Sequence, residues 1–245
     1  MNSSRRHPEL SVIIPTLNEA AHIGDLLDDV SQGEGLDVIV ADGGSKDDTA
    51  AQAVARGVRI CRGPAGRARQ MNQGASLARG AYYLFLHADS RLPVRFDEVV
   101  RRVLGDARVA AGAFSLGIDA DAKKIRLVEY WANLRSRYLG LPYGDQGLFL
   151  RAERFHLCGG FSDLPIMEDF AFIRDLRRLG TIVTVSERIQ TSPRRWRRMG
   201  VLRTTLINQA IVMGYLLGVS PHRLSRWYRR SRGIDKPGGQ VESAD

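Results

Sequence analysis

Acidic and polar side chains follow three apolar segments in the first ninety residues of the chain. The three endings are Asn18-Glu19 after residues 11–14, Asp42 after residues 38–41 and Asp89 after residues 82–86. Short apolar segments separated by helical patterns are typical of buried parallel strands. Ligands of open α/β sheets bind beyond the carboxyl ends of the strands. We therefore expect these polar side chains to border one ligand site.

Each acidic residue has a structural interpretation beside the functional one. Asp42 can accept hydrogen bonds from a ligand, or from backbone N–H groups of its own turn. Asp89 can bind a hard divalent cation that also takes phosphate oxygens, or it can form an Asx turn. Glu168 and Asp169 precede an amphipathic helix, where they can cap the helix or supply a general base.

Two arginines, Arg67 and Arg69, lie in the first turn of a helix that we predict over residues 66–79. Cations at this end of a helix oppose the helix dipole. This local conflict indicates an anion nearby, such as a diphosphate. The alternative is a solvated arginine face.

The elements that position these residues alternate between strands and helices. Strands are predicted at residues 11–14, 38–41, 58–61, 82–86, 109–118, 148–150 and 181–185. Helices are predicted at residues 23–30, 45–55, 66–79, 97–104, 125–139, 169–179 and about 197–217, with a short basic helix after Pro221. Ser45 and Asp48 have the spacing of a capping box for the second helix. This order predicts an α/β fold with a mostly parallel central sheet, helices on both faces and a C-terminal helical extension.

We expect three parts along the chain. Residues 10–190 form the main domain, with a nucleotide-binding half at 10–90 and an acceptor-binding half at 91–190. Residues 191–232 form a basic amphipathic extension, and residues 233–245 are expected to be disordered. The apolar stretch at 206–219 falls short of the roughly 20 residues that a membrane span needs.

The net charge of +9 and the sequence pI of about 10.0 favour an anionic partner, such as a phosphate-bearing ligand or an acidic membrane surface. Nucleic acid is a poor candidate, since the arginines are scattered and no binding module is recognisable. Two distant cysteines and a polar N-terminus without an apolar leader segment predict a cytoplasmic protein, either free or at the inner face of the cell membrane.

The motifs in combination resemble GT-A glycosyltransferases of the family-two type, over about residues 10–186. The matching segments are residues 12–19, 38–49, 66–80, His87-Ala88-Asp89 at the position of the D-x-D metal motif, and Glu168-Asp169 at the position of the catalytic pair. The chain is most similar to a bacterial subgroup labelled arsenosugar biosynthesis, through residues 66–72, 86–90, 143–147 and 194–228. That label does not identify the acceptor.

The resemblance implies a non-processive, inverting transferase of the hexosyltransferase type (EC 2.4) that uses a nucleotide-diphosphate sugar, with UDP-sugars favoured. Asp169 or Glu168 would be the general base, and Asp89 would bind Mg²⁺ or Mn²⁺. The donor would contact Pro15, Thr16, Asn18, Glu19, Asp42, Arg67, Arg69, Asn72, His87 and Ala88. The acceptor side would include Asp145, Gln146, Arg195 and Trp196.

Two residues depart from the family pattern. His87 replaces the first carboxylate of the metal motif. Imidazole is a poorer ligand than carboxylate for Mg²⁺ but is acceptable to Mn²⁺, and His87 can instead hydrogen-bond the donor. Ser192 replaces the glutamine of the Q-x-x-R-W motif of processive synthases, which argues against processive polymerisation.

Two other functions share parts of this pattern. Sugar nucleotidyltransferases usually carry a G-x-G-T-R-like loop where this chain has residues 15–19. A non-catalytic nucleotide-sugar-binding module is suggested by His87, but the Glu168-Asp169 pair weighs against it. The basic segment at 194–232 suits a peripheral membrane contact, a lipid-linked acceptor, a homodimer interface or packing across the domain.

Overall fold

The computed structural model describes residues 8–120 and 123–231, except the side chains of Lys123, Arg195, Arg197 and Arg198. The chain divides into two compact units. The first comprises Met1–Asp163 and Glu168–Pro193, and the second comprises Leu164–Met167 and Arg194–Asp245. The predicted disordered tail at 233–245 lies outside the described residues. Within the described ranges, no helix combines the length and hydropathy that crossing a bilayer would require.

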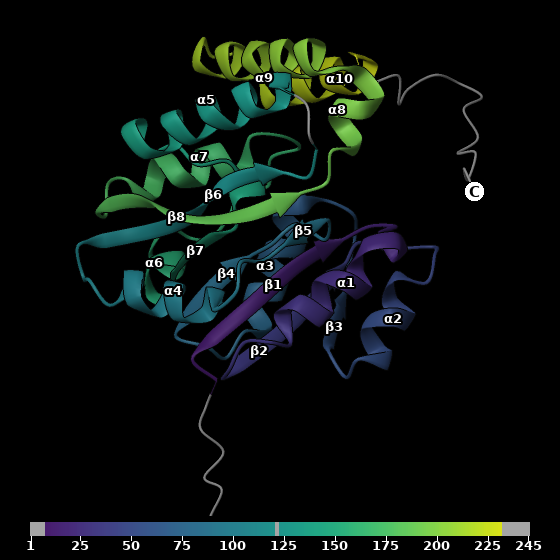
Figure 1. Cartoon of the computed structure of the whole chain (residues 1–245), viewed down its shortest axis with the longest axis vertical. Helices are drawn as coiled ribbons and strands as arrows, with labels where there is room; N and C mark the ends of the chain where they lie inside the picture. Colours follow the sequence, from purple (N-terminus) through teal and green to yellow (C-terminus); the bar gives the residue numbers. More distant parts are fainter. Residues whose placement is uncertain (1–7, 121–122, 232–245) are drawn as a thin grey trace, which may run out of the picture. The chain divides into compact units, whose positions relative to one another are not determined.

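The first unit contains one eight-stranded sheet with the strand order β3-β2-β1-β4-β7-β6-β8-β5 (Figure 1). The strands are β1 (Leu10–Thr16), β2 (Leu36–Asp42), β3 (Arg59–Arg62), β4 (Tyr82–Phe85), β5 (Ser90–Arg91), β6 (Val109–Ile118), β7 (Leu148–Arg151) and β8 (Thr181–Thr191). Only β7 and the short edge strand β5 pair antiparallel to their neighbours. The predicted α/β class with a mostly parallel sheet is confirmed.

Strands β2, β1 and β4 are neighbours, so their carboxyl ends share one edge of the sheet. Thr16 is in register with Asp42, and Ile13 is in register with Phe85. The three polar endings found in the sequence therefore follow adjacent strands. This position is the one at which open α/β sheets bind their ligands.

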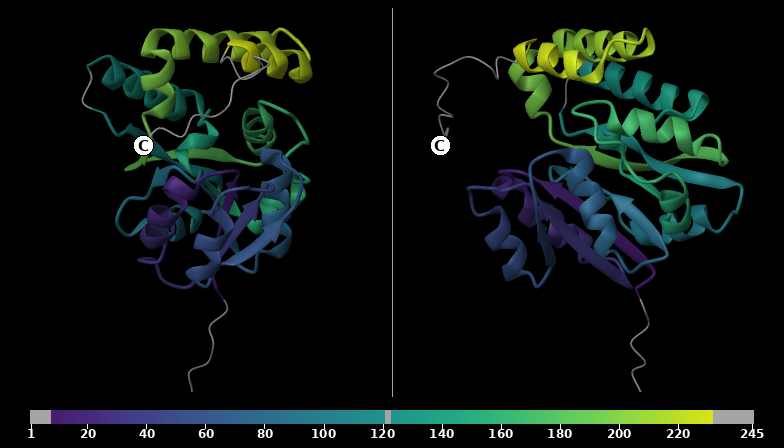
Figure 2. Two further views of the ribbon diagram at one scale, coloured as in Figure 1. Left: turned by 90° about the vertical axis from the view of Figure 1, so that its right-hand side faces the viewer. Right: turned by 180° about the vertical axis from the view of Figure 1, so that it is seen from behind.

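Helices cover both faces of the sheet (Figure 2). The helices of the first unit are α1 (Ala20–Val30), α2 (Thr49–Ala55), α3 (Arg67–Leu77), α4 (Phe96–Leu104), α5 (Lys123–Leu139), α6 (Ala152–Leu157) and α7 (Glu168–Leu176), with a 3-10 turn at Gly144–Gln146. Strand β1 shows why both faces need covering, since Val12 and Ile14 pack with α1 and α4 while Ile13 packs with α3. Every residue of β6 is likewise buried.

The second unit contains α8 (Arg194–Met199), α9 (Val201–Leu216) and α10 (Pro221–Ser231). The long helix predicted over about residues 197–217 is largely present as α9, but its first residues belong to the separate helix α8. It is interrupted at Gly200, whose φ of 79° is favourable only for glycine. The basic helix after Pro221 is present.

Three other local predictions differ from the structure. The capping box is wrong, because Asp48 makes no side-chain cap bond and the Ser45 hydroxyl bonds Asp42 instead. The strand expected at 181–185 continues to Thr191, where its polar half pairs with β6. Helix α6 was not predicted, since its six residues are too short to show a clear period.

The buried carboxamide of Gln70 joins three elements at the carboxyl edge of the sheet. Its Nε2 donates to the carbonyl oxygens of Thr16 and Ala41, at 2.7 and 2.8 Å. Its Oε1 accepts a hydrogen bond from the Gly66 N–H at 3.2 Å. Gly43 makes room for this side chain, because a Cβ there would lie 3.0 Å from the carboxamide. One side chain thus holds the ends of β1 and β2 against the start of α3.

We expect Gln70→Ala to lower the free energy of unfolding by about 2–4 kcal/mol, because buried carbonyl oxygens would lose their partner. Urea denaturation followed by circular dichroism measures this change. The control is Gln73→Ala on the same helix, whose Nε2 donates to the Arg62 carbonyl at an exposed position. Equal effects of the two substitutions would contradict the role assigned to Gln70.

Candidate active site

The loops that follow β1 and β2 are joined to each other by their own side chains. The Asn18 N–H donates to Ser45 Oγ at 2.9 Å, and Asn18 Oδ1 accepts from the Lys46 N–H at 2.9 Å. The Glu19 N–H donates to Thr49 Oγ1 at 2.8 Å. Asn18 has a φ of 54°, a left-handed conformation that asparagine tolerates better than most residues. The two sequence motifs therefore form one hydrogen-bonded platform.

Asp42 lies inside this platform, with only 2% of its surface exposed. Its carboxylate accepts hydrogen bonds from the backbone N–H groups of Gly44 and Ser45 and from the hydroxyl of Ser45. The turn-forming interpretation of Asp42 is thus realised. Thr16 is also buried, whereas Pro15 and Glu19 are partly exposed. Contacts of these residues with a nucleotide stay a prediction.

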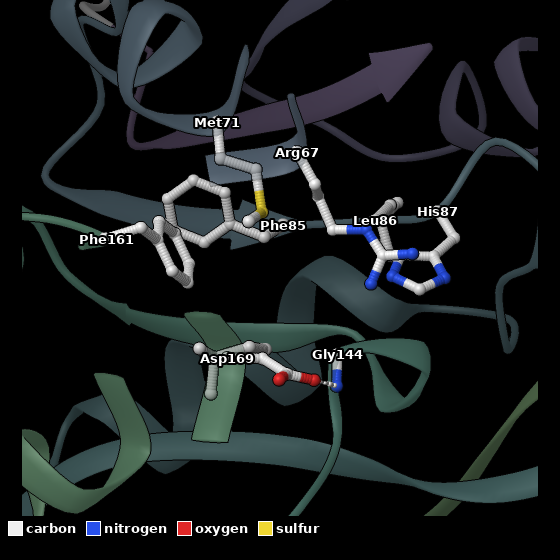
Figure 3. Close-up of a pocket in the computed structure, with 9 residues that line it drawn as sticks. Arg67, Met71, Phe85, Leu86, His87, Gly144, Phe161 and Asp169 are labelled. Atoms are coloured by element: carbon white, nitrogen blue, oxygen red, sulfur yellow. Dashed lines mark hydrogen bonds between the residues drawn. The ribbon is translucent and has the colours of Figure 1, made fainter. Parts of the chain in front are cut away.

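A pocket lies at the carboxyl end of β4 (Figure 3). Arg67 and His87 lie on one side of it, and Asp169 and Gly144 lie on the other. Its apolar lining consists of Met71, Phe85, Leu86, Leu148 and Phe161. The pocket therefore brings together the predicted residues Arg67 of α3, His87 of the loop after β4 and Asp169 of α7.

The carboxylate of Asp169 is held at the pocket by two backbone donors. Asp169 Oδ2 accepts from the Gly144 N–H at 2.8 Å, and Oδ1 accepts from the Phe170 N–H at 2.7 Å. An ionised carboxylate has about four lone-pair sites, so it can also accept a proton from a ligand hydroxyl. Asp169 is thus placed and oriented as a general base would be.

Gly144 lines the pocket, although it is not among the site residues predicted from the sequence. A Cβ at this residue would lie 3.1 Å from Asp169 Oδ2 and 3.3 Å from His87 Nε2. Any larger residue would therefore occupy the space between the carboxylate and the imidazole. The only signal in the sequence was its place in the 143–147 motif.

Glu168 differs from Asp169 although the two are adjacent. Glu168 is buried and forms an ion pair with Arg67, with 3.4 Å between Arg67 Nη1 and Glu168 Oε1. Burial raises the pKa of the Glu168 carboxyl, while the guanidinium of Arg67 acts in the opposite direction. Asp169 lines the pocket and Glu168 does not, so the structure favours Asp169 as the group that meets a ligand.

Two predicted donor-binding residues are engaged elsewhere. Arg69 forms a bidentate pair with Asp163, with distances of 2.9 and 2.8 Å. Asn72 accepts from the Phe161 N–H and donates to the Phe161 carbonyl oxygen. These contacts attach α3 to the segment after α6. The conflict with the helix dipole is relieved by Asp163 and Glu168, without requiring a bound anion.

His87 and Asp89 flank Ala88 in the loop between β4 and β5. His87 lines the pocket, Ala88 is buried, and Asp89 is partly exposed. The Asp89 carbonyl oxygen accepts from the Ser192 N–H, which ties this loop to the end of β8. Among the described residues, no three His, Cys, Asp or Glu side chains gather as a metal cluster. A cation here would therefore need ligands from substrate or water.

The residues predicted on the acceptor side belong to both units, and their role stays a prediction. Gln146 is fully buried, where its carboxamide bonds the Phe114 carbonyl oxygen and the Tyr143 N–H. It supports the loop that carries Gly144. Asp145 is partly exposed on that loop. Trp196 is buried in the second unit, and the side chain of Arg195 lies outside the described ones.

Three solved structures illustrate the similarity of this fold to known ones. TarS residues 1–349 from S. aureus, in complex with UDP, has a TM-score of 0.61 at 16% identity, covering 80% of this chain and 63% of that one. The mannosyltransferase PcManGT from Pyrobaculum calidifontis, in complex with GDP-Man and Mn²⁺, has a TM-score of 0.64 at 17% identity. The match covers 94% of this chain and 74% of that one. Glucosyl-3-phosphoglycerate synthase from Mycobacterium tuberculosis, in complex with Mn²⁺, UDP and glucosyl-3-phosphoglycerate, has a TM-score of 0.55 at 20% identity. The match covers 81% of this chain and 79% of that one.

These likenesses show the fold, and the chain spans less than two thirds of the length of the TarS structures. No curated protein sequence matches the chain. The family model described as glycosyl transferase family 2 matches residues 11–161, which include both interlocked loops, α3 and the loop after β4. This match spans more than half of the sequence, and the chain therefore belongs to glycosyl transferase family 2.

Proposed function

We propose that this protein is a non-processive, inverting glycosyltransferase that moves a sugar from a nucleotide-diphosphate sugar to an acceptor hydroxyl. The observation that carries the proposal is the pocket in which Asp169 faces Arg67 and His87. A base and a cation on opposite sides of one pocket match the two charges that sugar transfer develops. These are a proton leaving the acceptor and a negative charge growing on the diphosphate.

Asp169 accepts the proton of the acceptor hydroxyl as that oxygen attacks the anomeric carbon. The bond between this carbon and the diphosphate breaks on the opposite side, so the configuration inverts and the nucleoside diphosphate leaves. The Gly144 N–H keeps the carboxylate in place during this step. Glu168 acts indirectly, because its ion pair directs the guanidinium of Arg67 toward the pocket.

Arg67 stabilises the leaving diphosphate by its positive charge. Asp89 would hold Mg²⁺ or Mn²⁺, and His87 would either add a second ligand or hydrogen-bond the donor. One carboxylate and one imidazole suffice for a cation that takes its other ligands from phosphate oxygens and water. When bound, the cation would neutralise charge on the diphosphate. Two of the similar structures were solved with Mn²⁺, which supports this part of the proposal.

UDP-sugars are the favoured donors, because TarS and glucosyl-3-phosphoglycerate synthase were solved with UDP, although PcManGT was solved with GDP-Man. Pro15, Thr16, Asn18, Glu19 and Asp42 form or border the platform proposed to hold the nucleotide. A hexosyl transfer to a small-molecule or lipid-linked acceptor, a cytoplasmic location and the arsenosugar subgroup remain parts of the proposal. The described cysteines, Cys61 and Cys158, are free thiols, as a reducing compartment would keep them.

Asp169→Asn is expected to lower the turnover number at least about 100-fold, because the amide cannot take a proton. Donor binding should change little. Release of UDP from a UDP-sugar measures turnover, and calorimetric titration with UDP measures binding. Asp175→Asn on the same helix is the control, since Asp175 pairs with Arg178 away from the pocket. Unchanged turnover of Asp169→Asn would exclude it as the base and favour a binding module.

Asp89→Ala is expected to remove most of the thermal stabilisation that Mn²⁺ adds in the presence of UDP or GDP. The reason is that the only carboxylate proposed to bind the cation is lost. A thermal-shift titration with Mn²⁺ and Mg²⁺ measures this, with Asp25→Ala as the control at an exposed surface pair with Arg91. Equal metal dependence in wild type and Asp89→Ala would show that Asp89 is not the ligand.

Glu168→Gln is expected to gain stability relative to wild type as the pH rises. Because the pKa of Glu168 is raised in the folded protein, ionisation costs the folded state more than the unfolded state. Wild type therefore loses stability relative to the glutamine variant above about pH 4, where the unfolded carboxyl ionises. Denaturation of both proteins between pH 4 and 7 measures the difference. If wild type instead became more stable than Glu168→Gln as the pH rose, the raised pKa of Glu168 would be contradicted.

A further inference from the structure

The net charge of the protein is concentrated in its second unit. Residues 194–231 contain nine arginines and no lysine, aspartate or glutamate, so this segment alone carries +9. The whole chain also carries +9, which leaves the remaining residues neutral as a set. This segment is therefore the part of the chain whose net charge favours an anionic partner.

Helix α9 in this unit is apolar on two opposite sides. Thr204, Ile207 and Ile211 are buried on one side. The other side presents large apolar side chains at helical spacing, with exposed fractions between 58 and 76% for Leu202, Leu206, Met213, Leu216 and Leu217. Large apolar side chains gathered on one exposed side of a helix mark an interaction surface, so this stripe indicates a further partner.

Helix α10 forms a hairpin with α9 and supplies cations. A Cβ on Gly214 of α9 would lie 2.9 Å from the buried Leu224 of α10, and Arg203 donates to the Ser231 carbonyl oxygen. The two helices lie side by side (Figure 1). The arginines of α10 are exposed at positions 223, 226, 229 and 230. One hairpin thus offers an apolar stripe and a group of exposed cations.

We propose that the α9–α10 hairpin docks on the surface of an anionic lipid bilayer. The apolar stripe of α9 enters the boundary between headgroups and acyl chains, and arginines of the hairpin contact lipid phosphates. Helices that lie in a membrane interface combine these two features, whereas neither helix can span a bilayer. This docking does not depend on the proposed transferase activity.

The charge pattern decides between a bilayer and other occupants of the stripe. A second copy would bring a like-charged +9 segment against the first, which costs repulsion. A soluble polyanion would match the arginines but would leave the leucines in water. An anionic bilayer satisfies both groups at once, through charge attraction and burial of apolar surface.

The experiment is co-sedimentation of the full chain with vesicles of phosphatidylcholine alone or mixed equally with phosphatidylglycerol. We expect binding to the mixed vesicles, at least tenfold weaker binding to the neutral ones, and weakening at high salt. Arg226→Gln with Arg230→Gln should weaken binding roughly 30-fold, since each arginine near such a surface contributes about 1 kcal/mol. Arg174→Gln with Arg177→Gln, an equal loss of charge on the first unit, should have little effect.

Leu206→Glu with Met213→Glu should abolish binding, while Leu157→Glu, at an equally exposed leucine of α6, should not. Circular dichroism checks that each variant is folded. Three results would overturn the proposal. The first is that wild type does not bind the mixed vesicles. The second is that Leu206→Glu with Met213→Glu binds them as well as Leu157→Glu does. The third is that sedimentation equilibrium shows a dimer of wild type that Leu206→Glu with Met213→Glu dissociates. The last result would assign the stripe to a second copy.

Discussion

The site of this protein depends on how the carboxyl ends of β1 and β2 are joined to the start of α3. Where a strand leaves a parallel sheet, its backbone N–H and C=O groups no longer bond the neighbouring strand. Those that are buried need other hydrogen-bond partners. The carboxamide of Gln70 supplies them for Thr16 and Ala41 and also bonds the Gly66 N–H. Because Arg67 follows Gly66 directly, this arrangement also fixes where a cation meets the pocket.

A buried glutamine also fixes the backbone on the other side of the pocket. Gln146 bonds the Phe114 carbonyl oxygen and the Tyr143 N–H, which fixes the turn that carries Gly144. The Gly144 N–H then orients Asp169. Two buried glutamine side chains thus position the groups that we propose for chemistry, and neither of them lines the pocket.

Much of the fold could be predicted because its signals are local. The strands of the first half are short apolar segments, and helix α1 shows a clear period in Ile23, Leu26, Leu27 and Val30. The second half was harder, since β8 is half polar and α6 has only six residues. These two elements depend on contacts with residues distant in the sequence, and the residue pattern of one segment does not show such contacts.

The site was predictable in position but only partly in detail. Adjacent strands with polar endings located it, and Asp169, Arg67 and His87 do line one pocket. The donor roles of Arg69 and Asn72 rest on the family resemblance, which does not show their partners Asp163 and Phe161, about ninety residues later in the chain. Gly144 carries no chemical group at all. Its importance is the space that it leaves, and the sequence does not show which neighbours share that space.

The interlocked loops after β1 and β2 have a consequence for how this protein can vary in evolution. Asn18 bonds Ser45 and Lys46, and the backbone of Glu19 bonds Thr49, so neither loop keeps its shape without the other. A change in the shape of one loop would have to be matched by a change in the other. Positions 18, 45 and 49 should therefore be exchanged as a set among related chains, and single grafts from a relative should disturb both loops together.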